Sequence, residues 1–178
     1  MVHFYEEYTG TCIRMLPTVE NQCSAILELT RPYEVADRIK RLPRYLLPKN
    51  YTVAGELAAF FRRGDLKYKH DPNDDYDYWY SPRATLIRQG GDCEDFSIFA
   101  LSILEATGIP SYMVTGTWNG GGHAWVEGKD ERGWFMLETT EGKLYRNPEH
   151  PLWQRCIMRP PGYQARLAIS RDLCTPIY

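Results

Sequence analysis

The segment GGDCEDFSIFALSILEATG, residues 90–108, decides the organisation of the fold. Asp92 is a favourable helix N-cap, and Asp95, three positions later, can complete a capping box with it. Apolar residues then cover most of the helix circumference, a pattern typical of a central helix that is buried on nearly all sides. Cys93 would lie in the first turn, where free N–H groups and the helix dipole stabilise a thiolate.

Carboxylates flank this cysteine, and they would oppose ionisation of the thiol if their charges pointed toward it. At helical spacing we expect Glu94 and Asp95 to project away from Cys93. A cysteine near a helix start is structural more often than catalytic. The segment by itself therefore leaves both interpretations open.

The rest of the chain predicts an α+β fold in which helices come first and a consecutive antiparallel sheet follows. Helical spacing, caps and breakers predict helices over residues 33–42, 52–63 and 82–89. Alternating patterns predict strands over residues 111–118, 122–128 and 133–140, with another near 165–169. We treat residues 1–178 as a single domain with a core at about 70–142, decorated by N-terminal helices and a C-terminal wrap.

Composition excludes several function classes. The formal net charge of -2 gives no support for nucleic acid or an anionic membrane as the main partner. No apolar run reaches the roughly 20 residues that a membrane-spanning helix needs. The N-terminal segment MVHFYEEYTG lacks the pattern of a secretory signal, so we expect a cytoplasmic protein.

The cysteines do not suggest a metal site or a disulfide framework. There are five, an odd number, and no CxxC pair is present, so zinc-ribbon spacing is absent. In a chain of this size in a reducing compartment we do not expect disulfides. We expect the four cysteines other than Cys93 to be small buried side chains or unreactive surface thiols.

Among the four histidines, His123 is best placed to serve as a base for Cys93. It opens a predicted strand directly after the glycine-rich run 119–122. A symmetric hairpin with a loop over residues 129–132 would set His123 opposite Glu138, close enough for the carboxylate to hold the imidazole. A nucleophile–base pair needs such a third group. Glu127, on the same predicted face, is the alternative acid.

The segment from Tyr78 to Gly116, followed by GGHAWVEG and GWFMLETT, resembles the transglutaminase-like superfamily. The shared motifs are GDCED at a helix start, GIP before a strand, HAW, and a strand that ends with an acidic residue. They cover roughly residues 70–142 and occur in the right order and spacing. The resemblance implies a papain-like α+β core of the type found in bacterial and archaeal transglutaminase-like cysteine peptidases.

The resemblance also implies the roles of individual residues. Cys93 would be the nucleophile, His123 the base and Glu138 the acid, although the family usually has aspartate at this last position. Three aromatic residues would lie on the substrate or oxyanion side: Trp79, Trp118 and Trp125. Some related peptidases bind calcium near the equivalent acids, so Asp92 and Glu94 are candidate calcium ligands, and we expect no other cofactor.

The implied chemistry is acyl transfer on a peptide or protein amide through a thioester intermediate. Hydrolysis of a peptide, isopeptide or other amide bond is the favoured outcome, and transfer to an amine is the alternative. A catalytically inactive binding module with the same fold is the third interpretation. The sequence does not indicate an oligomeric state.

Overall fold

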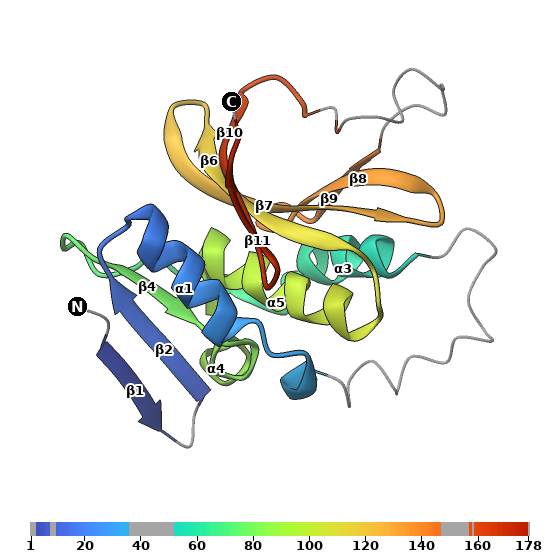
Figure 1. Ribbon diagram of the computed structural model, residues 1–178. Helices are drawn as coiled ribbons and strands as arrows, with labels where there is room; N and C mark the ends of the chain where they lie inside the picture. The colour runs from blue at the N-terminus through green and yellow to red at the C-terminus, as the bar shows by residue number, and fades with distance from the viewer. Residues whose placement is uncertain (1–2, 8–9, 36–51, 147–156, 158, 178) are drawn as a thin grey trace.

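The computed structural model describes residues 3–7, 10–35, 52–146, 157 and 159–177 (Figure 1). Its centre is helix α5 (Cys93–Ala106), which packs against one face of a six-stranded antiparallel sheet. The strand order is β11-β10-β6-β7-β8-β9. Figure 1 shows α1 (Val19–Leu29) and α3 (Val53–Arg63) on either side of α5, below this sheet. The layout is the α+β fold that the sequence predicts.

Four strands of the sheet, β6, β7, β8 and β10, were predicted, and two, β9 and β11, were not. The bounds are β6 (Ser111–Trp118), β7 (Gly121–Asp130), β8 (Gly133–Glu138), β9 (Lys143–Arg146), β10 (Tyr163–Ser170) and β11 (Leu173–Pro176). Alternate residues of β7 point to opposite faces, as the period of a strand requires. Ala124 and Val126 pack in the clusters that include α5, and Trp125 packs in a separate cluster.

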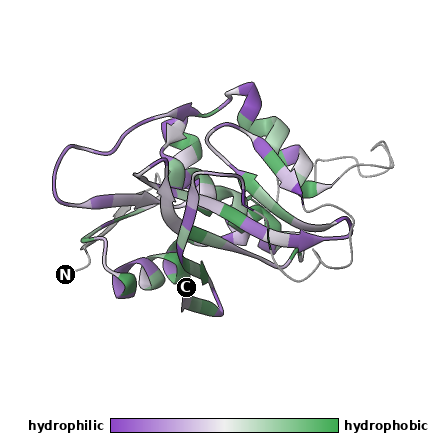
Figure 2. Cartoon of the chain, turned by 90° about the horizontal axis from the view of Figure 1, so that it is seen from above, coloured by the Kyte–Doolittle hydropathy of each residue, from purple (hydrophilic) through white to green (hydrophobic). Residues whose placement is uncertain are grey.

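The predicted helices are confirmed where they are described, whereas α1 (Val19–Leu29) was not predicted. Helix α3 (Val53–Arg63) begins at the cap Thr52 and ends at Gly64, whose φ of 71° is left-handed. Helix α4 spans Pro82–Arg88. Of the predicted helix 33–42, residues 33–35 are helical and the remainder lies outside the described residues. The helices carry hydrophilic and hydrophobic residues side by side (Figure 2), as expected for elements with one buried face.

A capping box holds the start of α5, as predicted. The N–H of Asp95 donates to Asp92 Oδ1 at 3.4 Å, and the N–H of Asp92 donates to Asp95 Oδ2 at 3.3 Å. Asp95 also accepts the backbone N–H of Tyr80 at 2.8 Å and lies 3.6 Å from the guanidinium of Arg88. These contacts fix the first turn of α5 to its neighbours, and with it Cys93.

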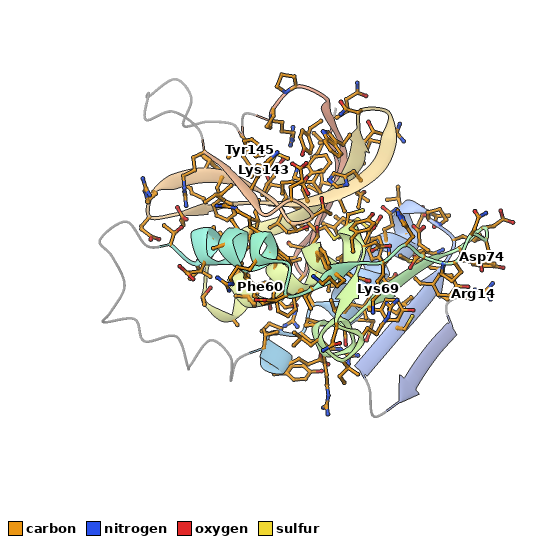
Figure 3. The ribbon with its side chains drawn as sticks, turned by 180° about the vertical axis from the view of Figure 1, so that it is seen from behind. Arg14, Phe60, Lys69, Asp74, Lys143 and Tyr145 are labelled. Carbon is orange, nitrogen blue, oxygen red and sulfur yellow. A yellow bond between two sulfur atoms is a disulfide. The ribbon has the colours of Figure 1, made fainter. Side chains whose placement is uncertain are left out.

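Several short strands outside this sheet were also not predicted. They are β1 (His3–Glu7), β2 (Gly10–Met15) and β4 (Asp77–Tyr80), which form a small sheet, and β3 (Lys67–Tyr68) and β5 (Gly90–Gly91), which pair in parallel. Figure 3 shows Arg14 of β2 beside Asp74, 3.6 Å apart, next to β4. A side chain at Gly90 would meet the carbonyl of Lys67 at 2.1 Å, so the glycine permits the close pairing of β3 with β5.

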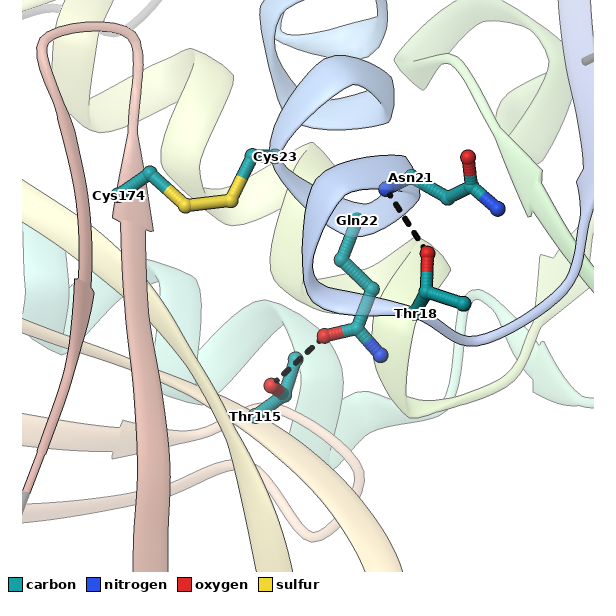
Figure 4. Close-up of a disulfide and its surroundings, with 6 residues drawn as sticks. All are labelled: Thr18, Asn21, Gln22, Cys23, Thr115 and Cys174. Carbon is teal, nitrogen blue, oxygen red and sulfur yellow. Dashed lines mark hydrogen bonds between the residues drawn. A yellow bond between two sulfur atoms is a disulfide. The ribbon is translucent and has the colours of Figure 1, made fainter.

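The expectation that the chain contains no disulfide is wrong. Cys23 of α1 (Val19–Leu29) is bonded to Cys174 of β11, 151 residues later (Figure 4). The bond joins α1 to the C-terminal hairpin, and a hydrogen bond of 3.1 Å from Thr115 to Gln22 joins the same helix to the sheet. Sequence spacing gives no sign of a pairing over such a distance, because it arises only when β11 packs near α1.

The described part of the chain contains no helix that is long and apolar enough to cross a membrane.

Candidate active site

Cys93 lies at the first position of α5 and is 5% exposed. Its sulfur lies against the backbone N–H of Ala124, the residue after His123, so the helix start meets the start of β7 at this point. Burial raises the pKa of the Cys93 thiol, and the charges of Glu94 and Asp92 raise it further, while the Ala124 N–H acts in the opposite direction. In this arrangement the cysteine is a protonated thiol.

The prediction that Glu94 projects away from Cys93 is wrong. The Cys93 thiol donates a hydrogen bond to Glu94 Oε2 at 2.9 Å. The reason is local: the capping box engages Asp92 and Asp95, and the flexible Glu94 side chain is left to fold back over the first turn. Asp95 does project away, as predicted, toward Tyr80 and Arg88.

Further carboxylates surround this pair. Burial and the charge of Glu94 raise the pKa of Asp92 to about 8. Burial also raises the pKa of Glu94, and Asp77 adds to this effect. The pKa of Asp71 is raised to about 6 by burial and by the charge of Asp92. The acidic groups near the helix start therefore hold protons more strongly than ordinary carboxylates.

β7 and β8 bring His123 and Glu138 together, but not in the predicted register. Lys129 pairs with Trp134, and the turn consists of residues 131–132 instead of 129–132, so each pair moves by two positions. A shift of two leaves every side chain on its original face, and Glu138 becomes a diagonal neighbour of His123. A long side chain reaches a diagonal neighbour. His123 Nε2 and Glu138 Oε2 lie 2.7 Å apart.

Both oxygens of Glu138 have hydrogen-bond donors. Thr140 donates to Oε1 through its backbone N–H at 2.9 Å and its hydroxyl at 2.7 Å, and Tyr163 donates to Oε2 at 2.9 Å. Burial tends to raise the pKa of Glu138, but the hydrogen bonds and charge of His123 and the bonds from Thr140 outweigh it and lower this pKa. Glu138 is 1% exposed and therefore buried. Its lowered pKa keeps the carboxylate ionised, and the hydrogen bonds to both oxygens fix its position.

The alternative acid, Glu127, has other partners. Arg159 donates bidentate hydrogen bonds to it at 2.5 and 2.9 Å. Trp125 and Tyr112 also donate to it. These donors occupy the carboxylate away from the imidazole. Glu138 is therefore the acid that contacts His123 in the described structure.

The three predicted aromatic residues lie in different environments. Trp79 is 1% exposed and packs in the same cluster as Cys93; its indole N–H has no hydrogen-bond partner among the described residues. Trp125 is completely buried, and its N–H is used by Glu127. Trp118 is half-buried, with its ring 5.6 Å from that of His123. Trp118 is the most exposed of the three.

Sequence reasoning missed three residues at this site: Thr140, Tyr163 and Tyr68. Thr140 lies two residues after the acid, and its hydroxyl in the run ETT was the available signal. The hydroxyl of Tyr68 interacts with the Cys93 thiol: burial raises the pKa of Tyr68, and the charge of Cys93 and a hydrogen bond to it add to this. No local pattern indicates either tyrosine, because each comes from a strand far away in the sequence.

Asp92 and Glu94 carry the hard oxygen ligands that calcium prefers, and the mutual repulsion of their charges would be relieved by a cation. Within the described residues, however, no three His, Cys, Asp or Glu side chains converge closely enough to hold a metal ion. The charge of the cluster suits a divalent cation, but the spacing does not.

Comparisons with known proteins place this fold. Residues 34–139 match the profile of the transglutaminase-like superfamily. A search of curated proteins gave no significant match. The calcium-bound structure of Legionella pneumophila LapG is similar at 18% identity, with 91% of this chain and 87% of that chain covered and a TM-score of 0.55.

Two further structures are similar. EGTA-treated LapG of the same organism gives 20% identity, 92% and 88% coverage and a TM-score of 0.54. A candidate cysteine protease from Cytophaga hutchinsonii gives 16% identity, 79% and 61% coverage and a TM-score of 0.44. At these identities the two LapG structures establish the fold and nothing more. With the match over residues 34–139, the chain belongs to the transglutaminase-like superfamily.

Proposed function

We propose that this protein is a cysteine-dependent hydrolase of peptide, isopeptide or other amide bonds, with Cys93 as nucleophile, His123 as base and Glu138 as the acid that orients it. The observation that carries the proposal is the 2.7 Å contact of His123 with Glu138, beside the helix start that holds Cys93. Membership of the transglutaminase-like superfamily supports a cysteine peptidase type of activity.

The reaction uses these groups in sequence. His123 takes the proton from Cys93, and the sulfur attacks the carbonyl carbon of the amide, so that a C–S bond forms and the carbonyl oxygen becomes an oxyanion. The Cys93 N–H, at the first position of α5, has no partner within the helix and is placed to donate to this oxyanion. Glu138 stabilises the imidazolium.

Collapse of this intermediate breaks the C–N bond, and His123 gives its proton to the leaving amine. Water, deprotonated by His123, then attacks the thioester carbon, so that a C–O bond forms, the C–S bond breaks and the thiol is restored. If a primary amine attacks in place of water, the product is a new amide, which is the transglutaminase alternative.

The contact between Cys93 and Glu94 represents a resting arrangement of this site. A thiol that donates to a carboxylate is not a nucleophile, so substrate binding has to displace Glu94 or His123 has to compete with it for the proton. Glu94 and His123, both side chains of this chain, therefore compete for the Cys93 proton.

Mass spectrometry of covalent intermediates tests the proposal. The protein is incubated with a panel of peptide, isopeptide and simple amide substrates, quenched with acid and mapped for acyl groups. We expect a hydroxylamine-sensitive thioester on Cys93 that is absent in Cys93→Ser. Addition of a primary amine separates the two outcomes, since a new amide product identifies transfer. A complete absence of acyl-Cys93 across the panel supports the inactive binding module instead.

One earlier expectation remains a prediction. Cytoplasmic localisation is contradicted if the Cys23–Cys174 bond is found oxidised in cells, because disulfides are rare in the cytosol.

A further inference from the structure

Tyr163 reaches the acid of the proposed triad from a distant part of the chain. It is the first residue of β10 and pairs with Trp118 of β6 in the central sheet, where Figure 1 shows the two strands side by side. Its hydroxyl donates to Glu138 Oε2 at 2.9 Å, the same oxygen that contacts His123. The Tyr163 hydroxyl and the His123 imidazole thus share one oxygen of Glu138.

The aromatic ring of Tyr163 also lies beside the imidazole of His123. It stacks on Trp118 with the ring centres 5.9 Å apart, and it contacts Trp125 edge-on at 5.3 Å. The centre of the His123 ring lies 6.1 Å from it. These rings place an apolar wall beside the His123–Glu138 hydrogen bond, and such a wall keeps water from competing for the carboxylate.

The hydroxyl is held as a neutral donor. Burial raises the pKa of Tyr163, and the charge of Glu138 raises it further. Other titratable groups nearby are Tyr145, Glu141 and Lys143; the ammonium of Lys143 is engaged by Glu141 at 2.7 Å. Tyr163 is thus the tyrosine that donates directly to the acid among the described residues.

Resting on the catalytic assignment above, we propose that Tyr163 is a positioning residue, whose hydroxyl fixes Glu138 Oε2 and whose ring shields the hydrogen bond between Glu138 and His123. Thr140 holds the other oxygen, so the carboxylate is fixed at both ends. Loss of the Tyr163 hydroxyl leaves His123 as the remaining hydrogen-bond partner of Oε2 among the described residues.

Tyr163→Phe tests this inference, with Tyr112→Phe as the matched control. Tyr112 donates to a different buried carboxylate, Glu127, at 3.2 Å and has no contact with His123 among the described residues. The first readout is the imidazole N–H proton resonance of His123, assigned by its loss in His123→Ala. In Tyr163→Phe, Oε2 loses one donor and accepts more strongly from the imidazole, so we expect the resonance to move downfield; in Tyr112→Phe we expect it to stay unchanged.

The second readout is acylation of Cys93 by p-nitrophenyl acetate. We expect a decrease of about tenfold in Tyr163→Phe, in line with the loss of one hydrogen bond to a charged group. Thermal unfolding shows that both variants are folded. If the His123 resonance is absent in the wild type, or keeps its position in Tyr163→Phe, the inference is overturned, even where acylation declines. If Glu138→Gln acylates normally, the proposed function itself fails.

Discussion

Glu138→Gln removes one charge and leaves the size of the side chain unchanged. In the wild type, all of the contacts to this carboxylate come from donors: His123, Tyr163 and both groups of Thr140. A glutamine has one oxygen and one NH2 group, so its NH2 group faces either His123 and Tyr163 or Thr140, all of which are donors. In either orientation the negative charge that stabilises the imidazolium is lost.

The expected effect on catalysis is large. Loss of the acid partner of a catalytic histidine reduces turnover by about a thousandfold or more. The effect on stability is smaller, about 1.5–3 kcal/mol for one charge-assisted hydrogen bond that is not replaced. The catalytic loss should therefore greatly exceed anything that partial unfolding explains.

The assay is the rate of nitrophenolate release when p-nitrophenyl acetate acylates Cys93, measured well below the unfolding temperature of each variant. Glu127→Gln is the matched control, because Glu127 is also a completely buried glutamate of this sheet but binds Arg159. We expect it to lose stability and to acylate at nearly the wild-type rate. A folded Glu138→Gln that acylates as fast as the wild type would refute the role of Glu138.

Three further predictions follow from the charges and the disulfide. Glu94→Gln removes the charge that holds the Cys93 proton, so Cys93 should be alkylated by iodoacetamide several-fold faster at neutral pH, as peptide mapping measures; a slower reaction contradicts this reading of the Cys93–Glu94 bond. The pKa values of Asp71 and Asp92 are raised from 3.8 to about 6 and about 8, so the folded state retains protons that the unfolded state releases. The unfolding free energy should therefore decrease as pH rises from about 4 to about 8. The lowered pKa of Glu138 acts in the opposite direction, and its stabilisation is lost as pH falls below about 4.5. Thermal unfolding from acidic to alkaline pH should show both slopes, with a weaker alkaline slope in Asp92→Asn; a melting temperature that rises steadily toward alkaline pH argues against it. Reduction of the Cys23–Cys174 bond should cost about 2–5 kcal/mol in chemical denaturation, and the double Cys→Ser variant should be insensitive to reductant.

The parts of the fold that could be predicted are those set by local pattern. The capping box of Asp92 and Asp95 marks the start of α5, and Thr52 and Gly64 mark the ends of α3. The alternation of β6 to β8 gives the strands and places His123 and Glu138 on one face. These features depend on neighbours within a few residues, which a sequence displays directly.

The features that were missed depend on long-range packing or on rotamers. The hairpin register was wrong by two residues, because the turn is tighter than the flanking glycines suggest. The Cys23–Cys174 bond and the Tyr163–Glu138 contact join segments that only the folded sheet brings together. The Glu94 side chain was misplaced because its direction is set by a rotamer and not by helical spacing.

The reactivity of Cys93 relative to Cys12 tests the central claim most directly. Cys12 is the other free thiol among the described residues, and it is more exposed than Cys93. Without a base, the buried Cys93 beside Glu94 should be the slower of the two, since both effects oppose the thiolate. With His123 as its base, we predict that iodoacetamide alkylates Cys93 faster than Cys12 at pH values near 6, and that His123→Ala abolishes this advantage. Alkylation of Cys93 no faster than that of Cys12, or a rate unchanged in His123→Ala, would contradict the account.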